Sequence, residues 1–201
     1  MTGAPDPFLV PPDEPFALLR DWVATARADG VREPLAVTLA TAGSDGHVAG
    51  RTVVLRAVDA DGVLLTSMRT ATKGRQLREN PWAAVTAYWR EVGRQVNLAG
   101  PVHEVDGAPA DALFAAMPRP AQAATALSVP GAPLTDEAAL RRRAEALVAA
   151  ERPIPRPTDW VGYRIAPEQV ELWQSSPQDR LHRRLRYERT ATGWTVARLQ
   201  P

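Results

Sequence analysis

The stretch Gly50-Arg-Thr-Val-Val-Leu-Arg56 places two arginines around a run of aliphatic and β-branched residues. This composition is typical of a β-strand that is buried along its middle. Because side chains alternate along an extended chain, the strand divides into two faces. Arg51, Val53 and Leu55 share one face, and Thr52, Val54 and Arg56 share the other. The arginines either reach water at the strand ends or form part of an anion site, and the rest of the chain has to decide between these alternatives.

The composition indicates one domain. A chain of 201 residues, 45% hydrophobic and 23% charged, is long enough for one sizeable core. A net charge of +1 argues against general nucleic-acid binding, which needs a basic surface. Cysteine is absent and the three histidines are not clustered, so no metal site is expected. No targeting segment or membrane-spanning apolar run occurs, so we expect a soluble, cytoplasmic protein.

The order of the predicted elements favours an antiparallel β-barrel, mainly β with flanking helices. Residues 1–12 are rich in proline and predict an N-terminal arm, while residues 13–201 form the domain. A helix is expected from the N-cap Asp13 to Gly30, and strands over 35–41, 48–58 and 63–67 should form a meander. Further strands are expected over 82–89, 94–105, 161–165, 170–173, 185–189 and 194–199. Helices are expected over 109–117 and 135–151, with a loop over 118–133 between them.

Two segments are suited to bind an anion. The helix predicted over 70–79 begins with Thr70, Thr72 and Lys73, which would add hydroxyls and a cation to the free N–H groups of a helix start. The segment from Arg180 to Arg189 contains five arginines and one histidine. Such a cluster of guanidinium groups fits a phosphate or a carboxylate better than nucleic acid.

Several motifs resemble the pyridoxamine 5′-phosphate oxidase family. They are Glu171-Leu-Trp-Gln, Arg180-Leu-His-x-Arg, the final Arg198-Leu-Gln-Pro, Lys73-Gly-Arg-Gln-Leu-x-Glu-Asn-Pro and the stretch from Arg51 to Arg56. The resemblance covers nearly the whole chain from Asp13 onward. Within the family, Tyr88-Trp-Arg-Glu and Pro153-Ile-Pro-Arg-Pro resemble the flavin-dependent oxidases of phenazine biosynthesis.

The resemblance implies a split β-barrel homodimer with FMN bound at the subunit interface. The residues that it implies as FMN contacts are Arg51, Thr52, Val53, Val54, Leu55, Arg56, Thr66, Ser67, Lys73, Gln95, Trp173 and Arg184. Arg51 and Lys73 would hold the phosphate, and the last two of the set would come from the partner subunit. Arg180 and His182 would face the substrate and are the catalytic candidates. The implied reaction passes hydride from the substrate to FMN, and molecular oxygen then reoxidises the flavin.

Differences from the family pattern bear on the substrate. Pyridoxamine phosphate oxidases grip the substrate phosphate with a tyrosine, an arginine and a serine, where this chain has Leu113, Met117 and Ala121. Each lost charge-assisted bond is worth roughly 1.5–3 kcal/mol, so a phosphorylated vitamer is disfavoured. Pro130-Gly131 also replaces a Gln-Ser pair, and the loop from Ser175 to Asp179 is one residue longer than usual.

Three functions remain in view. The first is an FMN-dependent oxidase that aromatises a reduced polycyclic carboxylate in phenazine-type biosynthesis. The second is a pyridoxine or pyridoxamine 5′-phosphate oxidase. The third is a split-barrel protein that binds flavin, deazaflavin or haem without turnover, which the retained pair Arg180 and His182 argues against.

Overall fold

The chain passes from one part of the sheet to another between the adjacent residues Leu55 and Arg56. In the computed structural model, which describes residues 6–201, the N–H of Leu55 donates to the carbonyl of Leu35 at 2.9 Å. The N–H of Arg56 instead donates to the carbonyl of Leu64 at 2.7 Å. The single strand expected over 48–58 is therefore wrong, because the chain bends here and changes its pairing partner.

Within residues 6–201, ten strands form the sheet. They are β1 (Ala36–Ala42), β2 (Val48–Val54), β3 (Ala57–Asp59), β4 (Gly62–Met68), β5 (Trp82–Trp89), β6 (Arg94–Val105), β7 (Trp160–Ile165), β8 (Gln169–Gln174), β9 (Arg183–Thr190) and β10 (Gly193–Leu199). β2 pairs with β1 and β3 pairs with β4, both antiparallel, so the expected pairings of the meander are present but its middle strand is divided in two. The strands expected over 82–89 and 94–105 are confirmed.

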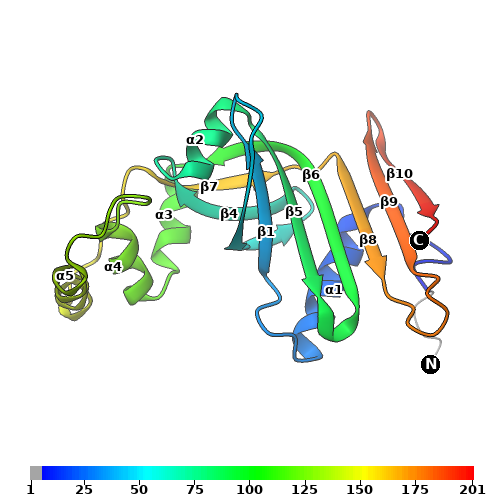
Figure 1. Cartoon of the computed structure of the whole chain (residues 1–201), viewed down its shortest axis with the longest axis horizontal. Helices are drawn as coiled ribbons and strands as arrows, with labels where there is room; N and C mark the ends of the chain where they lie inside the picture. The colour runs from blue at the N-terminus through cyan, green and yellow to red at the C-terminus, as the bar shows by residue number, and fades with distance from the viewer. Residues whose placement is uncertain (1–5) are drawn as a thin grey trace.

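The long strand β6 closes the barrel. Its first half pairs with β8 and its second half with β7, so it belongs to both parts of the sheet. The antiparallel pairs β1–β2, β3–β4, β4–β7, β7–β6, β6–β5 and β5–β1 complete a circuit, which is split where β2 passes into β3. β8, β9 and β10 continue the sheet beyond β6, as the right-hand side of Figure 1 shows. The predicted split-barrel fold is confirmed.

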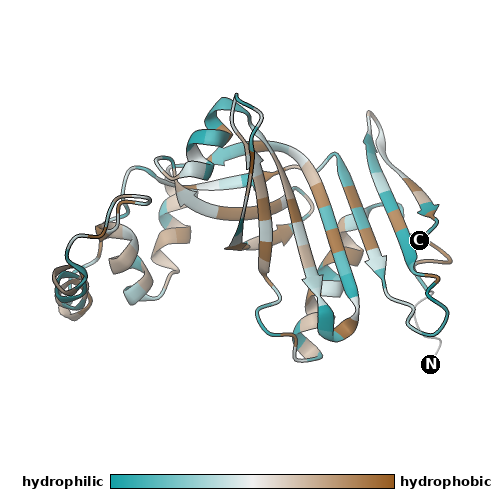
Figure 2. Cartoon of the chain, viewed as in Figure 1, coloured by the Kyte–Doolittle hydropathy of each residue, from teal (hydrophilic) through white to brown (hydrophobic). Residues whose placement is uncertain are grey.

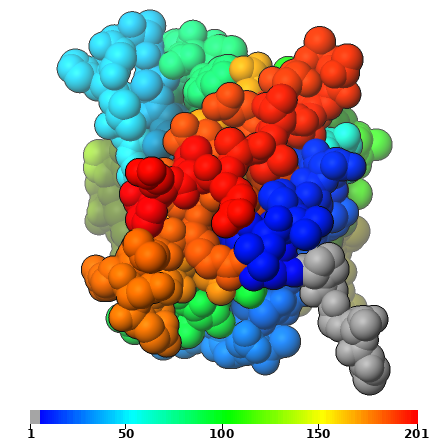
Figure 3. Space-filling view, turned by 90° about the vertical axis from the view of Figure 1, so that its right-hand side faces the viewer, coloured from blue at the N-terminus to red at the C-terminus, as the bar shows by residue number. Residues whose placement is uncertain are grey.

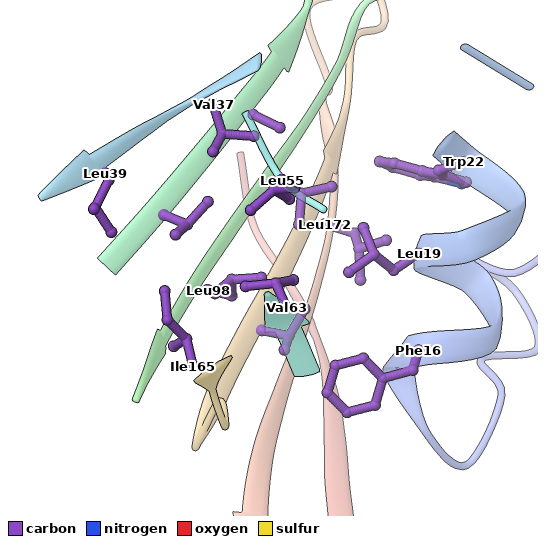
Figure 4. Packing of buried hydrophobic residues seen from close by; sticks show 14 of the residues in the cluster. Phe16, Leu19, Trp22, Val37, Leu39, Leu55, Val63, Leu98, Ile165 and Leu172 are labelled. Carbon is purple, nitrogen blue, oxygen red and sulfur yellow. The ribbon is translucent and has the colours of Figure 1, made fainter. Parts of the chain in front are cut away.

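Helix α1 (Pro15–Ala28) covers the core of the sheet. Phe16, Leu19 and Trp22 are at most 4% exposed, and Figure 4 shows them pointing from the helix toward the strands. The helix is capped by Glu14, whose carboxylate accepts from the N–H groups of the second and third helical residues at 2.8 and 2.9 Å. The expected N-cap Asp13 is therefore wrong by one position, because the longer glutamate side chain reaches these groups.

Three helices form a lobe at one end of the sheet (Figure 1): α3 (Ala108–Ala115), α4 (Arg119–Leu127) and α5 (Glu137–Ala149). The loop expected over 118–133 is thus wrong in its first part. The prolines that suggested a loop stand at Pro118 and Pro120, just before and inside the first turn, where a missing N–H costs no helical bond. Phe114 and Trp160 pack edge to face at 5.3 Å in the separate core of this lobe.

The described part of the N-terminal arm packs against the domain. Phe8 is 2% exposed, lies 6.1 Å from Trp22 and carries the guanidinium of Arg183 over its ring. Arg183 also forms an ion pair with Asp6. Figure 3 shows this segment beside the C-terminal strand β10, while residues 1–5 lie outside the described part of the chain.

Hydrophobic and hydrophilic bands alternate along the strands of the sheet (Figure 2), which gives it a core side and an outer side. Valine and leucine residues such as Val85 and Leu98 fill the core side, whereas Thr52 and Tyr88 are exposed on the outer side. Among the helices in residues 6–201, none is long and apolar enough to cross a membrane.

Candidate functional site

Two cations lie near each other where a side chain of β2 reaches across β1 to helix α2 (Thr72–Glu79). The Arg51 guanidinium donates from Nη1 to the Thr41 hydroxyl at 2.6 Å and from Nη2 to Oε1 of Gln76 at 3.3 Å. The Thr41 hydroxyl in turn donates to the same Oε1 of Gln76 at 2.6 Å. Arg51 is thus fixed by neutral groups, which leave its charge uncompensated.

Lys73 on α2 is the second cation. Burial lowers its pKa from the ordinary lysine value, and the charge of Arg51 lowers that pKa further. Neither side chain forms an ion pair with a carboxylate of residues 6–201. Two partly buried cations held close together are unfavourable unless an anion binds between them.

The start of α2 adds backbone donors to these cations. Its N-cap Ala71 makes no side-chain capping bond, so no side chain takes the place of an anion there. Gly74 allows the helix to lie against the preceding chain, since a Cβ would come within 2.4 Å of the carbonyl oxygen of Met68. Thr72 accepts from Arg75 at 3.3 Å. We call Arg51, Lys73 and the start of α2 the anion seat, and its donors fit a phosphate monoester.

The other predicted flavin contacts of the first half of the chain lie nearby. Val53 packs on the core and Leu55 is 6% exposed, so only their backbone faces outward, at the strand edge where the barrel is split. Thr52 and Val54 lie on the exposed outer side. Thr66 and Ser67 lie at the end of β4, shortly before the anion seat, and the exposed Arg56 donates from Nε to the hydroxyl of Thr66 at 3.4 Å.

A row of side chains crosses the outer side of the sheet further along. Tyr88 on β5 pairs with Gln95 on β6, Gln95 with Trp173 on β8, and Trp173 with Arg184 on β9. Residues directly opposite each other in neighbouring strands share a face, so these four side chains lie side by side. We call them the outer row.

His182 lies against this row. Its ring centroid is 4.8 Å from that of Trp173, and its Nδ1 accepts from the backbone N–H of Ser176 at 3.1 Å. The bond leaves Nε2 as the nitrogen that carries the proton in the neutral ring. Arg180 is exposed, has a positive φ of 63° and forms no ion pair within residues 6–201. The loop before β9 therefore presents a free cation and an oriented imidazole.

Arg184 is already paired in this structure. Its Nε and Nη2 donate to Oε1 of Glu171 at 3.1 and 2.8 Å, while Arg186 donates to the other carboxylate oxygen at 3.2 and 3.0 Å. The predicted role of Arg184 did not include this carboxylate. Its spacing of two residues from Arg186 was the signal available in the sequence, because such residues share a strand face.

One chain does not bring the anion seat and the outer row together. β2 and β8 are separated by β1, β5 and β6, which amounts to about 19 Å at the usual strand spacing. Arg51 also lies on the side of its strand opposite to that of Trp173, because its cross-strand partner is the buried Leu39. Thr41 and Gln76, which hold Arg51, were missed by sequence reasoning. Gln76 follows Lys73 by three residues on the same helix face, which was the available signal.

An antiparallel split barrel with an anion seat and a row containing two aromatic residues fits a class of flavin-binding proteins, and comparison with known proteins supports this class. Residues 23–174 match the family described as pyridoxamine 5′-phosphate oxidase, and residues 160–201 match the pyridoxine 5′-phosphate oxidase C-terminal dimerisation region. The chain belongs to the pyridoxamine 5′-phosphate oxidase family and is a flavin-dependent oxidase.

Relatives of two kinds match the chain over most of its length. The dihydrophenazinedicarboxylate synthase of Burkholderia lata is 42% identical over 95% of this chain and 90% of its own length. A pyridoxine/pyridoxamine 5′-phosphate oxidase of Gluconobacter oxydans is 37% identical over 94% of each chain. The crystal structure of PhzG from Burkholderia lata in complex with tetrahydrophenazine-1-carboxylic acid matches with a TM-score of 0.93 and 40% identity, covering 100% of this chain and 99% of that one.

The three positions that differ from the family's phosphate grip lie in the helical lobe. Leu113 and Met117 pack against its core, next to Phe114. Ala121 is half-buried in the first turn of α4. These side chains make this part of the lobe apolar and offer no donor to a phosphate.

Proposed function

We propose that the protein is an FMN-dependent oxidase that aromatises a reduced phenazine-type carboxylate. FMN would bind between two copies of the chain, with its phosphate on the anion seat. The pairing of two unneutralised cations, Arg51 and Lys73, supports this placement, because a phosphate dianion would balance both charges.

The partner subunit would supply the outer row. The distance of about 19 Å between β2 and β8 within one chain supports a site completed by a second copy. The matching dimerisation region, which includes β8 and β9, supports the same arrangement. Gln95 and Trp173 would then border the flavin ring. The hydrogen bonds from Arg184 to Glu171 would keep the Arg184 side chain in position.

The chemistry that FMN supplies when bound is acceptance of a hydride and transfer of the two electrons to molecular oxygen, with hydrogen peroxide as the product. The chain's own residues bind and orient the substrate. Arg180 would hold the substrate carboxylate, because its guanidinium has no competing carboxylate within residues 6–201. His182 would receive the substrate's proton at Nδ1 once the ring releases the backbone N–H of Ser176, because Nε2 already carries the proton of the neutral ring.

The substrate class rests mainly on one observation. Where pyridoxamine phosphate oxidases are expected to grip a phosphate, this chain has the apolar Leu113 and Met117 packed into the helical lobe. A flat, partly reduced polycycle gains from an apolar wall, whereas a phosphate dianion would lose its hydrogen bonds there. The bound tetrahydrophenazine-1-carboxylic acid in the 40% identical PhzG structure supports the same class.

Anaerobic flavin reduction tests this proposal. We expect a dihydro- or tetrahydrophenazine carboxylate to bleach the flavin absorbance, and hydrogen peroxide to form when air is admitted. Arg180→Ala should slow the reduction by about tenfold or more without changing flavin content. Arg142→Ala, on the exposed face of α5, is the matched control. Rapid reduction by pyridoxine phosphate, with none by the phenazine carboxylates, would assign the chain to the vitamer oxidases instead.

A further inference from the structure

A cavity of about 240 Å³ lies between α2 and the strands β6 and β7, on a different side of the helix from Gln76 and the anion seat. Leu77 and Val102, which are 5% and 8% exposed, form an apolar part of its wall. Apart from Gly74 near the start of α2, none of the residues assigned to the flavin or the substrate lines it. The cavity is therefore separate from the proposed active site.

Tyr163 on β7 supplies a hydroxyl donor to this cavity. The residue as a whole is 4% exposed, and its hydroxyl, which is not among the fully buried unsatisfied atoms of residues 6–201, opens into the cavity. Burial, and secondarily the charge of Glu104, raise the pKa of Tyr163 to about 12, so the hydroxyl stays protonated. The hydroxyl is thus available to donate a hydrogen bond to a ligand in the cavity that carries an acceptor.

The charges around the cavity leave one cation unpaired. Arg69 donates from Nε and Nη2 to the two carboxylate oxygens of Glu104 at 3.0 and 2.5 Å, and from Nη2 to Asp106 at 2.7 Å. These acidic groups are thereby neutralised. Arg78 forms no ion pair within residues 6–201 and lines the same cavity as Tyr163. A free guanidinium and a free hydroxyl thus face the same space.

We propose that this cavity binds a small aromatic monocarboxylate, with the carboxylate on Arg78 and Tyr163 and the ring against Leu77 and Val102. A monoanion is preferred to a phosphate dianion, because Arg78 supplies one unpaired positive charge, whereas the charge of Arg69 is already balanced by Glu104 and Asp106. The volume admits one aromatic ring but leaves little room for a tricycle. The site is independent of the flavin and of the oxidase reaction.

Calorimetric titration of the purified dimeric holoenzyme with benzoate tests the site. We expect saturable binding of benzoate and at least about tenfold weaker binding of benzamide, the neutral isostere, and of phenyl phosphate. Arg78→Gln should weaken benzoate binding by about tenfold, and Tyr163→Phe by several-fold. Arg142→Gln makes the same exchange on exposed α5 and should leave binding unchanged.

Repeating the titrations in an Arg180→Ala protein separates this cavity from the proposed substrate site. Benzoate should still bind that variant with unchanged affinity, and flavin content should stay the same in Arg78→Gln and Tyr163→Phe. The proposal is overturned if benzoate does not bind, if benzamide binds as tightly, if Arg78→Gln has no effect, or if Arg180→Ala abolishes binding. None of these outcomes depends on which substrate the flavin oxidises.

Discussion

The Arg51 guanidinium is held 2.6 Å from the hydroxyl of Thr41, a side chain that is itself 2% exposed. The Thr41 hydroxyl donates a hydrogen bond to Gln76 on α2. The side chain of Arg51 on β2 therefore links β1 and α2. This contact orients the guanidinium before any ligand arrives. Preorganisation of this kind lowers the entropic cost of binding a phosphate.

Thr41→Val keeps the shape of the side chain but removes the acceptor for Arg51. We expect FMN to bind about three- to tenfold more weakly, because the guanidinium loses its orientation but not its charge. Fluorescence titration of the apoprotein with FMN measures the effect. Riboflavin, which lacks the phosphate, should bind the variant and the parent protein equally. Equal weakening for both flavins would mean that Thr41 supports the site in some other way.

Lys73 is the only lysine in the sequence, so its pKa can be measured directly. Reductive methylation with ¹³C-formaldehyde would label this side chain and the N-terminal amine, and NMR would follow each signal with pH. We expect the pKa of Lys73 to lie below that of an exposed lysine in the apoprotein, owing first to burial and then to Arg51.

Bound FMN should shift this titration in the opposite direction. A phosphate favours the charged lysine, so the pKa of Lys73 should rise on binding, and by linkage FMN affinity should fall as the pH rises through the pKa of the free form. Lys73→Met should remove this alkaline loss of affinity. A titration that FMN leaves unchanged would place the phosphate elsewhere.

Leu55→Ala should destabilise the fold at the bend between the two parts of the sheet. Leu55 is 6% exposed and belongs to the main core, so truncation should lower the free energy of unfolding by about 2–5 kcal/mol. Leu134→Ala, at a position that is 60% exposed, should cost less than about 0.5 kcal/mol. Urea unfolding of both variants provides the comparison, and equal losses would contradict the assigned role of Leu55.

Tyr187→Phe should leave the protein as stable or make it more stable. Tyr187 is fully buried, and its hydroxyl has no hydrogen-bond partner in the described part of the chain. Removing an unsatisfied hydroxyl recovers up to about 1–3 kcal/mol of desolvation cost. Thermal unfolding measures the change in stability. Tyr163→Phe serves as a comparison, because it removes the same hydroxyl from a tyrosine that lines a cavity. A clear drop in melting temperature for Tyr187→Phe would indicate that the hydroxyl is hydrogen-bonded in solution.

Much of the fold was predictable because local signals agreed with it. Alternating side chains located the strands Trp82–Trp89 and Arg94–Val105 to the residue. The prolines near residue 118 are compatible both with a loop and with the start of a helix, and here the prediction was wrong, because they begin helix α4. The cationic residues Arg51 and Lys73 were selected from the family resemblance and from the chemistry of a helix start, and the structure places them together.

The sequence by itself determined most of the elements, the alternating faces and the residues that can bind an anion, because these depend on neighbours along the chain. Only the tertiary structure decided that the strand after Gly50 bends at Leu55 and joins two sheets, because that depends on hydrogen bonds to Leu35 and Leu64. It also decided that Arg51 is hydrogen-bonded to neutral side chains and that Arg184 is paired with Glu171, because these partners are distant in sequence and come together only in the folded chain. Long-range pairing follows from the packing of the whole barrel, which no local segment specifies.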